Sequence, residues 1–389
     1  MTQDPVITLL RDLVAIDSVN PSLVSGGRGE AEVAAFLADV MRHADLDVTI
    51  QQAQPGRPNV IGVLNGRHAG RTLMLCGHTD TVGVAGMDRP FSADIRGNRL
   101  YGRGAQDMKG GVAAMVDAAR TLVRDGFEAG RVIVAAVIDE EHASAGADAL
   151  VREWHADAAV ITEPTDLNIG IAHKGFQWVS VHTGGRAAHG SRPTEGRDAI
   201  LRMGRVLAAL ESAGRDLESA RTHPLLGTAS LHASVINGGT ELSTYPASCS
   251  LQFERRTLPG EADDVAVREA EGIVARLLDQ DAEFEARVEG TFGRGAYEMP
   301  AAHPLVSMLR DAAASAGVTA REIGLSFWTD AAILGAAGIP TVLFGPGGAG
   351  LHSTEEYVLI PDVCACRDAL VRVARNFAGT NGRRAPALG

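Results

Sequence analysis

The stretch TLMLCGHTD, residues 72–80, indicates the class of fold that this chain adopts. It opens with an almost continuous apolar run, which is typical of a strand covered by helices on both faces of a mainly parallel sheet. His78 and Asp80 follow where such a strand ends, and ligands of parallel α/β sheets bind beyond these carboxyl ends. The two side chains are therefore candidates for a metal site, although aspartate is equally at home in an ordinary turn.

Continuous apolar runs recur elsewhere in the chain, and helical periodicities lie between them. The runs are VIVAAVI (132–138), AAVI (158–161) and TVLF (341–344). Apolar residues spaced three and four apart predict a helix over 33–40, and GGVAAMVDAARTLV (110–123) predicts another. This alternation favours an α/β fold with a mainly parallel, mixed sheet.

The strands between about 176 and 290 follow a different pattern. In YPASCSLQFER (245–255), apolar and polar residues alternate, which is typical of an antiparallel strand with one buried and one solvated face. TASLHASV (228–235) and EFEARVE (283–289) alternate in the same way. Two segments with apolar residues three or four apart predict helices among these strands: DAILRMGRVLAAL (198–210) and DDVAVREAEGIVARLL (263–278).

These two kinds of strand predict two domains. A chain of 389 residues is too long for one compact core. We expect an α/β domain over 1–175 and 291–389, interrupted by an inserted α+β domain over 176–290. The inserted domain would hold the antiparallel sheet and the two helices.

Composition narrows the partners and the compartment. The chain has 36 Lys and Arg against 48 Asp and Glu, a net charge of −12, which argues against nucleic acid as a partner. The opening MTQDPVITLL lacks the pattern of a secretory signal, and no apolar run is long enough to predict a membrane span. The cysteines are scattered, so we expect reduced thiols in a cytoplasmic protein. They are Cys76, Cys249, Cys364 and Cys366.

Acidic residues and histidines follow each of the continuous runs. Besides His78 and Asp80, these positions carry Asp139, Glu140, Glu141, Glu163 and His352. Asp107, in GRGAQDMKGG, precedes the helix predicted from 110. Because one sheet edge would gather these carboxylates, their mutual repulsion predicts bound divalent cations. Imidazole and carboxylate without thiolate suit a catalytic zinc, cobalt or manganese site.

The adjacent pair Glu140–Glu141 allows two roles at once. Neighbouring side chains of an extended segment point apart, so one can bind metal while the other faces substrate as a base. Glycine-rich alternatives fit less well. GRGAQD has Asp107 where a dinucleotide fingerprint needs glycine, GAQDMKGG lacks the Ser or Thr of a phosphate-binding loop, and no G-x-S-x-G nucleophile motif occurs.

A series of motifs spans nearly the whole chain. In order they are LLRDLVAIDSVNPS, GHTDTV, GRGAQDMKGG, DEEHASAGA, TEPT, GGRAAHGSRPTEGRDAI, ERRTLPGE and LHSTEEY. With these motifs the chain resembles the binuclear-zinc metallopeptidase and amidohydrolase family that includes acetylornithine deacetylase, succinyl-diaminopimelate desuccinylase, aminoacylase and glutamate carboxypeptidase. The resemblance implies a zinc-peptidase-like catalytic domain and an inserted domain that mediates homodimerisation.

The resemblance also implies a metal site with two Zn²⁺ per subunit, for which Co²⁺ or Mn²⁺ could substitute. Asp107 would bridge both ions, and the other ligands would divide into two pairs. His78 and Glu163 would complete one ion; Glu141 and His352 would complete the other. Asp80 would hydrogen-bond His78 and fix its tautomer.

Further residues take implied roles in catalysis and substrate binding. Glu140 would be the general base and acid. His189 would reach the active site of the partner subunit and stabilise the oxyanion, and Arg256 would bind the substrate carboxylate. Ser243 stands where many members of the family have an asparagine near the substrate, and Ala143 replaces a frequent glycine.

The expected function is hydrolysis of the amide bond of an N-acyl amino acid, most similar to that of acetylornithine deacetylase. It would proceed by two-metal activation of a bridging water with Glu140 as the base. Alternatives within the family are succinyl-diaminopimelate desuccinylase, dipeptidase and carboxypeptidase activity. A non-catalytic binding homologue is an alternative from another class, but none of the ligands nor Glu140 is lost.

Overall fold

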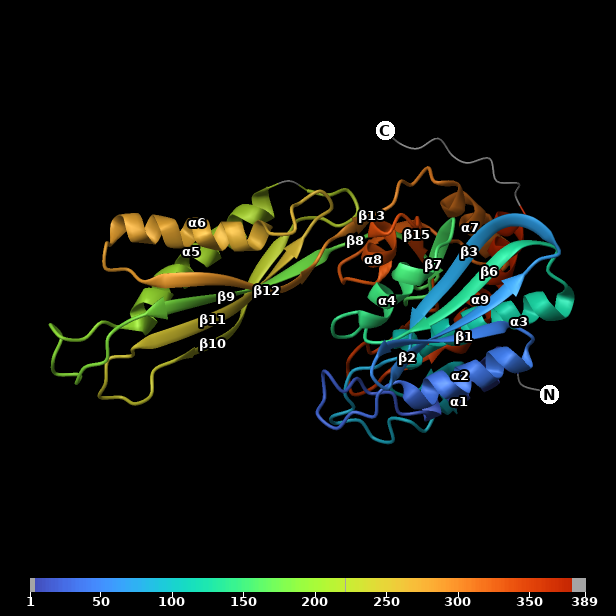
Figure 1. Ribbon diagram of the computed structural model, residues 1–389, viewed down its shortest axis with the longest axis horizontal. Coiled ribbons are helices and arrows are strands. Elements are labelled where there is room, and N and C mark those ends of the chain that lie inside the picture. Colours follow the sequence, from blue (N-terminus) through green and yellow to red (C-terminus); the bar gives the residue numbers. More distant parts are fainter. Residues whose placement is uncertain (1–3, 221, 380–389) are drawn as a thin grey trace. The chain divides into compact units, whose positions relative to one another are not determined.

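The structure is a computed structural model that describes residues 4–220 and 222–379, and these form two compact units (Figure 1). The first holds the described residues of Met1–Ile171, Met299–Ile323 and Thr329–Gly389. The second holds those of Ala172–Glu298 and Gly324–Trp328, a range that includes 176–290. Three short strands lie where the chain passes from one range to the other: β8 (Ile169–His173), β13 (Tyr297–Glu298) and β14 (Glu322–Leu325).

The sheet of the first unit is built on β3 (His68–His78), the strand that contains TLMLC. β3 pairs in parallel with β6 (Ala129–Val137) and with β7 (Ala158–Ile161), and β7 pairs in parallel with β15 (Thr341–Leu343). β1 (Asp47–Gln54) and β2 (Arg57–Asn65) add antiparallel strands, giving the order β1-β2-β6-β3-β7-β15. The four continuous runs thus form four neighbouring buried strands, which confirms the predicted mixed α/β sheet.

Helices cover both faces of this sheet (Figure 1). On β2, Gly62 faces Met41 of α2 (Ala31–His43), whereas Asn59, on the opposite face, hydrogen-bonds the carbonyl of Gly146 in α4 (Ala145–Glu153). α3 (Gly110–Asp125) and α9 (Ile360–Ala378) also contact the sheet, and α1 and α7 pack on them. The bounds of the remaining helices are Pro5–Ala15 for α1, Pro304–Ser315 for α7 and Ala331–Ala336 for α8.

A small second sheet connects two loops that are distant in the sequence. Its order is β16 (Gly348–Ala349), β17 (Tyr357–Leu359), β5 (Arg99–Tyr101) and β4 (Asp94–Arg96). β5 leads into a π-helical turn over Ala105–Lys109, which continues into α3. The sheet therefore brings the segment before α3 next to the loop between β16 and β17.

α3 approaches the end of β7 closely because it begins with glycine. A Cβ on Gly111 would lie 2.0 Å from the carbonyl oxygen of Thr162, so no larger residue fits without a shift of the backbone. This contact places the turn before α3 beside Glu163, which follows Thr162.

The second unit holds an antiparallel sheet with two helices on one face (Figure 1). Its order is β10 (Ser230–Gly238), β11 (Ser248–Thr257), β9 (Gly175–Gly184) and β12 (Ala286–Arg294). Alternate residues of β9 and β11, such as Val181 and Leu251, are buried against α5 (Ala199–Ser219) and α6 (Val265–Gln280). The antiparallel sheet and the two helices were both predicted from the sequence.

One predicted strand begins later than its alternation suggested. EFEARVE alternates from residue 283, but β12 starts at Ala286. The amide of Phe284 hydrogen-bonds the carbonyl of Asp281, so the first residues of this pattern form the turn after α6. Phe284 is still buried in the core of the unit, which explains why its position fits the pattern of a strand.

Two further observations bear on the composition. Over residues 4–220 and 222–379, no helix is both long and apolar enough to cross a membrane. All four cysteines carry free thiols.

Candidate metal centre

The predicted ligands of the first unit meet at the carboxyl edge of its parallel strands. His78 is the last residue of β3, Glu140 and Glu141 lie just beyond β6, and Glu163 lies just beyond β7. Because β6, β3 and β7 are parallel neighbours, their carboxyl ends share one edge of the sheet. Asp107 and His352 come to this edge from the π-helical turn and from the loop between β16 and β17.

The carboxylate of Asp107 lies between two imidazoles. Its Oδ1 is 3.2 Å from Nε2 of His78, and its Oδ2 is 3.3 Å from Nε2 of His352. Each oxygen thus faces a different histidine. A carboxylate in this arrangement is suited to bridge two cations.

The other carboxylates divide between these histidines. Oε1 of Glu163 is 3.8 Å from Nε2 of His78, and Oε2 of Glu141 is 3.1 Å from Nε2 of His352. Two groups of three residues each have donor atoms that all lie within 4.8 Å of one another. The first group is His78, Asp107 and Glu141, and the second is His78, Glu140 and Glu163. Glu140, predicted as the base, is therefore among the groups that could reach a metal.

Crowding and burial shift the pKa values of these acids. Burial, with the charges of Glu163 and Asp330, raises the pKa of Glu140 well above its ordinary value. Burial and the charges of Asp107 and Asp330 do the same for Glu163. Burial and Asp107 raise the pKa of Glu141 to about 7. Burial and the mutual repulsion of the carboxylates thus raise the pKa of all three glutamates.

The imidazoles are the cationic counterpart of this cluster. Burial opposes protonation of His78, but hydrogen bonds to Asp107 and Asp80 outweigh it and raise its pKa well above the usual value. Hydrogen bonds to Asp107 and Glu141 raise the pKa of His352 to about 10. Divalent cations would replace these protons, since metal binding requires neutral imidazole and ionised carboxylate.

An unused acceptor supports the fit of a metal. Oε1 of Glu141 is buried and has no hydrogen-bond partner among the described residues. A buried carboxylate oxygen without a partner is costly, and a bound cation would satisfy it. The set of imidazole and carboxylate donors, with no thiolate, also fits a catalytic divalent ion.

Asp80 lies behind the ligands and holds several of them in place. Its carboxylate accepts hydrogen bonds from the backbone amides of Glu140 at 3.1 Å and Glu141 at 3.2 Å. Nδ1 of His78 donates to the backbone carbonyl of Asp80 at 3.0 Å and lies 3.5 Å from its carboxylate. Asp80 therefore orients both His78 and the pair of glutamates.

Asp80 belongs to a buried network of hydrogen bonds that the sequence did not predict. Nδ2 of Asn20 donates to Asp80 at 2.8 Å and to Asp139 at 3.0 Å. Arg57 donates from Nη2 to Asp139 at 2.9 Å, and from Nε and Nη2 to the two oxygens of Glu30 at 2.7 and 2.6 Å. Asp139 has a positive φ of 67°, and this network holds the turn that carries Glu140 and Glu141. Asn20 lies within the quoted opening motif, but nothing in the sequence signals its partners.

Glu356 fixes the loop that carries Asp107. Its carboxylate accepts the backbone amides of Gly104 at 3.0 Å, Gln106 at 2.9 Å and Asp107 at 3.1 Å, and it pairs with Nη1 of Arg103 at 2.6 Å. Glu356 is buried and follows His352 by four residues. It therefore ties together the two loops that bring Asp107 and His352 to the centre.

Replacing Glu356 with glutamine is expected to lower metal affinity about 10–100-fold, as the loss of a group that orients ligands does. The amide keeps one acceptor but leaves the buried guanidinium of Arg103 without a counter-charge, so unfolding should also be easier by about 3 kcal/mol. Competition with a chelating dye measures the first effect and urea denaturation the second. Glu355→Gln, at an exposed neighbouring position, is the matched control and should change neither. Unaltered metal affinity in Glu356→Gln would contradict the orienting role.

The remaining predicted residues lie in the second unit. His189 and Ser243 lie close together. The amide of Gly190 donates to the carbonyl of Ser243 at 2.7 Å, and His189 forms an isolated antiparallel β-bridge with Thr244. Nδ1 of His189 lies 2.8 Å from Oγ of Ser191, and the loop is exposed. Arg256 lies on β11 and pairs through Nε with Glu254 at 2.6 Å.

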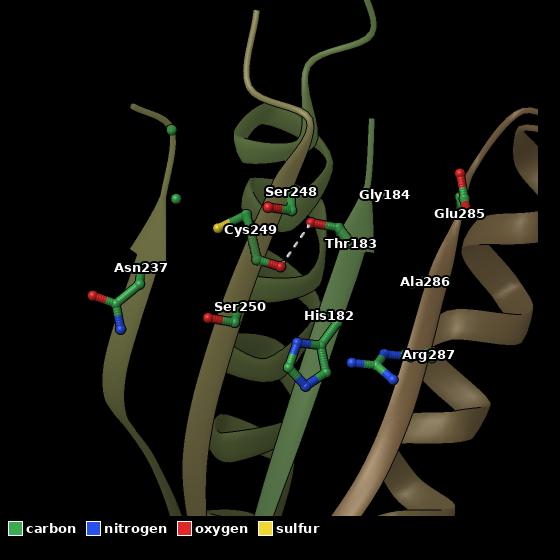
Figure 2. Close-up of a pocket in the computed structure, with 12 residues that line it drawn as sticks. His182, Thr183, Gly184, Asn237, Ser248, Cys249, Ser250, Glu285, Ala286 and Arg287 are labelled. Atoms are coloured by element: carbon green, nitrogen blue, oxygen red, sulfur yellow. Dashed lines mark hydrogen bonds between the residues drawn. The ribbon is translucent and has the colours of Figure 1, made fainter. Parts of the chain in front are cut away.

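A hollow of about 690 Å³ lies on the face of the antiparallel sheet that α5 and α6 leave open. Figure 2 shows His182 of β9 and Arg287 of β12 side by side in it, with Ser250 of β11 next to His182. The residues that line this hollow include none of the predicted ligands or catalytic residues.

A mixed α/β sheet with two imidazoles and several carboxylates gathered at its carboxyl edge fits the class of metal-dependent hydrolases. Residues 74–376 match the family model described as peptidase family M20/M25/M40, and the chain belongs to this family. The resemblance inferred from the motifs is thereby confirmed. As a member of this family, the protein is a hydrolase that acts on amide bonds.

Curated relatives match over nearly the full chain. The chain is similar to an acetylornithine deacetylase of Myxococcus xanthus, with 30% identity over 95% of this chain and 97% of the relative. It is also similar to N-formyl-4-amino-5-aminomethyl-2-methylpyrimidine deformylase of Bacillus subtilis, with 29% identity over 92% and 91%.

Solved structures share the fold. A tripeptidase from Staphylococcus aureus has a TM-score of 0.81 at 19% identity, covering 97% of this chain and 98% of its own. An M20 family metallo-carboxypeptidase from Sulfolobus solfataricus has a TM-score of 0.77 at 17% identity, covering 97% and 100%. These likenesses confirm the fold class, with its mixed sheet and separate antiparallel sheet.

Proposed function

We propose that this enzyme cleaves the amide bond of an N-acyl amino acid, in the manner of an acetylornithine deacetylase. The observation that carries the proposal is the carboxylate of Asp107 between His78 and His352, because this arrangement suits hydrolysis assisted by two metal ions. The curated acetylornithine deacetylases that match most of the chain support the N-acyl amino acid as the class of substrate.

We further propose two zinc ions as the metals, with cobalt or manganese able to substitute. His78 and Glu163 would hold one ion, Glu141 and His352 the other, and Asp107 both. Bound ions of this kind polarise a carbonyl oxygen and lower the pKa of water. The mixed imidazole and carboxylate donors support this assignment.

In this proposal Glu140 moves the proton of the reaction. It would take a proton from the attacking water and pass it to the departing amine. The half-buried position of Glu140 beside His78 and Glu163 supports the role, because a base must lie within reach of the water that it activates. Asp80 would fix the orientation of Glu140 through its bond to the backbone amide.

The roles of the second unit follow from the family resemblance. Arg256 would bind the carboxylate of the substrate, with Ser243 near the substrate, and His189 would stabilise the oxyanion in the active site of a partner subunit. This last role requires a homodimer formed through the second unit. The homodimer and a cytoplasmic location stay predictions.

A hydrolysis screen tests the proposed function. The zinc- or cobalt-loaded enzyme is offered N-acetyl, N-succinyl and N-formyl amino acids and dipeptides, and the released amine is quantified. We expect N-acetyl amino acids to give the highest kcat/KM. A preference for N-succinyl substrates or for dipeptides would instead indicate desuccinylase or dipeptidase activity, and no hydrolysis of any of them would refute the proposal.

A further inference from the structure

The open face of the antiparallel sheet in the second unit has two ends of different chemistry. One end is the polar hollow of Figure 2, where Ser250, His182 and Arg287 lie in one cross-strand row. The other end carries an aromatic patch formed by Phe176, Trp178 and Phe292. Their ring centroids lie 5.2 to 5.8 Å apart, which is within the range of favourable aromatic contacts.

This aromatic patch is unusual for the chain as a whole. Only 4% of the residues are aromatic and only three are tryptophan, yet two of these tryptophans, Trp178 and Trp328, contact Phe176. Trp178 is nevertheless 41% exposed. An aromatic cluster with an exposed member offers an apolar surface on which a ligand can pack.

The patch lies next to Arg256, the predicted partner of the substrate carboxylate. Arg256 pairs with Phe176 across β11 and β9, and its guanidinium lies 5.6 Å from the centre of that ring. Trp178 is on the next row of the same face, so it is a diagonal neighbour of Arg256, for which Cα atoms are typically about 7–8 Å apart. One molecule of the size of an amino acid can therefore contact both.

Glu254 holds the arginine and the tryptophan in fixed positions. One of its oxygens accepts Nε of Arg256 at 2.6 Å, and the other accepts the indole Nε1 of Trp178 at 2.8 Å. Over the described residues, the guanidinium of Arg256 donates no further hydrogen bond, so its Nη atoms can bind a carboxylate. Side chains positioned before binding lose less entropy when the ligand arrives.

Positive charges lie close to the guanidinium of Arg256 and favour an anion there. Arg294 lies over the ring of Phe292 at 5.4 Å from its centre. Burial lowers the pKa of Lys174, and the positive charge of Arg256 lowers it further. The negative charge of Glu254 is already paired with Arg256. A carboxylate beside Arg256 would therefore be attracted. Glu289 pairs with Ser180 in the next row of the same face, so the preference for an uncharged side chain over a cationic one rests on the aromatic rings of the patch and not on charge.

We propose that this surface selects N-acyl amino acids with a large, uncharged aromatic side chain in preference to N-acetylornithine. The α-carboxylate binds the Nη edge of Arg256, and the side chain packs on Trp178 and Phe292. The inference rests on the proposed function, because it keeps the deacylation of an N-acyl amino acid and specifies the side chain.

The first test compares substrates that share an acetyl group and differ only in side chain. With metal-loaded enzyme, kcat/KM for N-acetyl-L-phenylalanine should exceed that for N-acetyl-L-ornithine at least about 10-fold. Trp178→Ala should lower kcat/KM for N-acetyl-L-phenylalanine about 10-fold and that for N-acetyl-L-alanine less than about 2-fold. Trp178→Phe should restore most of the loss, and it replaces Trp178→Ala if that variant fails to fold. His182→Ala, on the same face of the same strand, is the matched control and should change neither substrate.

A preference for N-acetyl-L-ornithine or N-acetyl-L-glutamate would overturn the inference, as would equal losses on all substrates in Trp178→Ala. Calorimetric binding of N-acetyl-L-phenylalanine and N-acetyl-L-ornithine to metal-loaded Glu140→Gln separates this inference from the proposed function. Tighter binding of the aromatic compound, with no hydrolysis of any screened substrate by the wild type, would support the surface and refute the function. Hydrolysis with equal binding of the two compounds would refute the surface alone.

Discussion

Glu140→Gln is expected to lower kcat by about 10²–10⁴-fold, the usual contribution of a positioned general base. Glutamine has the shape of glutamate but accepts no proton at neutral pH, so the water would attack without a base. Because Asp80 binds the backbone amide of Glu140 and not its side chain, the turn should keep its position in the variant. The measurement is kcat on the best substrate of the screen, with metal content determined on the same sample.

The metal content decides between two roles for Glu140, because its donor atom also lies within reach of His78 and Glu163. If Glu140 is the base, Glu140→Gln keeps two divalent ions per chain and loses turnover. Loss of an ion would make Glu140 a ligand, and more than a tenth of the wild-type kcat would remove the role of base. Glu140→Asp, which keeps the acid on a shorter side chain, should have intermediate activity.

The fold was predictable where burial acts on local sequence. TLMLC, VIVAAVI and AAVI are buried on both faces, so their composition alone indicates the central strands β3, β6 and β7. The alternation of exposed and buried residues in β11 was also predictable, because one face of this strand is solvated and the other is buried. Polar strands at the edge of the sheet could not be predicted in this way. In β1 only Gln51 is buried, so the sequence of this strand shows no apolar face.

The candidate site was predictable because of one rule of topology. Parallel strands end at a common edge, so His78, Glu141 and Glu163 had to meet once their strands were recognised as neighbours. The geometry adds what the rule does not contain, namely that the two oxygens of Asp107 face different histidines.

The residues that support the ligands were not predictable. Arg57 and Glu30 are 27 positions apart and Glu356 and Gly104 are 252 apart, and no periodicity links such pairs. Each of these polar groups is buried only because its partner arrives from another part of the fold. A sequence presents them as ordinary surface charges.

Removing the metal with a chelator is expected to abolish hydrolysis, and a single substitution at Asp107 should affect both ions at once. The wild type should bind two divalent ions per chain. Asp107→Asn should weaken both positions, because each oxygen of this carboxylate faces a different imidazole. His352→Ala should remove one ion and leave the position beside His78 occupied, since the predicted ligands that His352 pairs with are Asp107 and Glu141. Metal analysis after dialysis against zinc, with kcat on the same samples, measures both effects.

Thermal unfolding provides the independent control for this prediction. Ions that bind only the folded state stabilise it by about 2.7 kcal/mol per site at a concentration 100-fold above Kd, so zinc should raise the Tm of the wild type. His352→Ala should keep part of this increase and Asp107→Asn little of it, because the burial and crowding that raise the pKa of Glu141 and Glu163 are relieved only where a cation binds. Equal zinc content and equal stabilisation in the two variants would contradict a bridging Asp107 and would point to two separate metal sites.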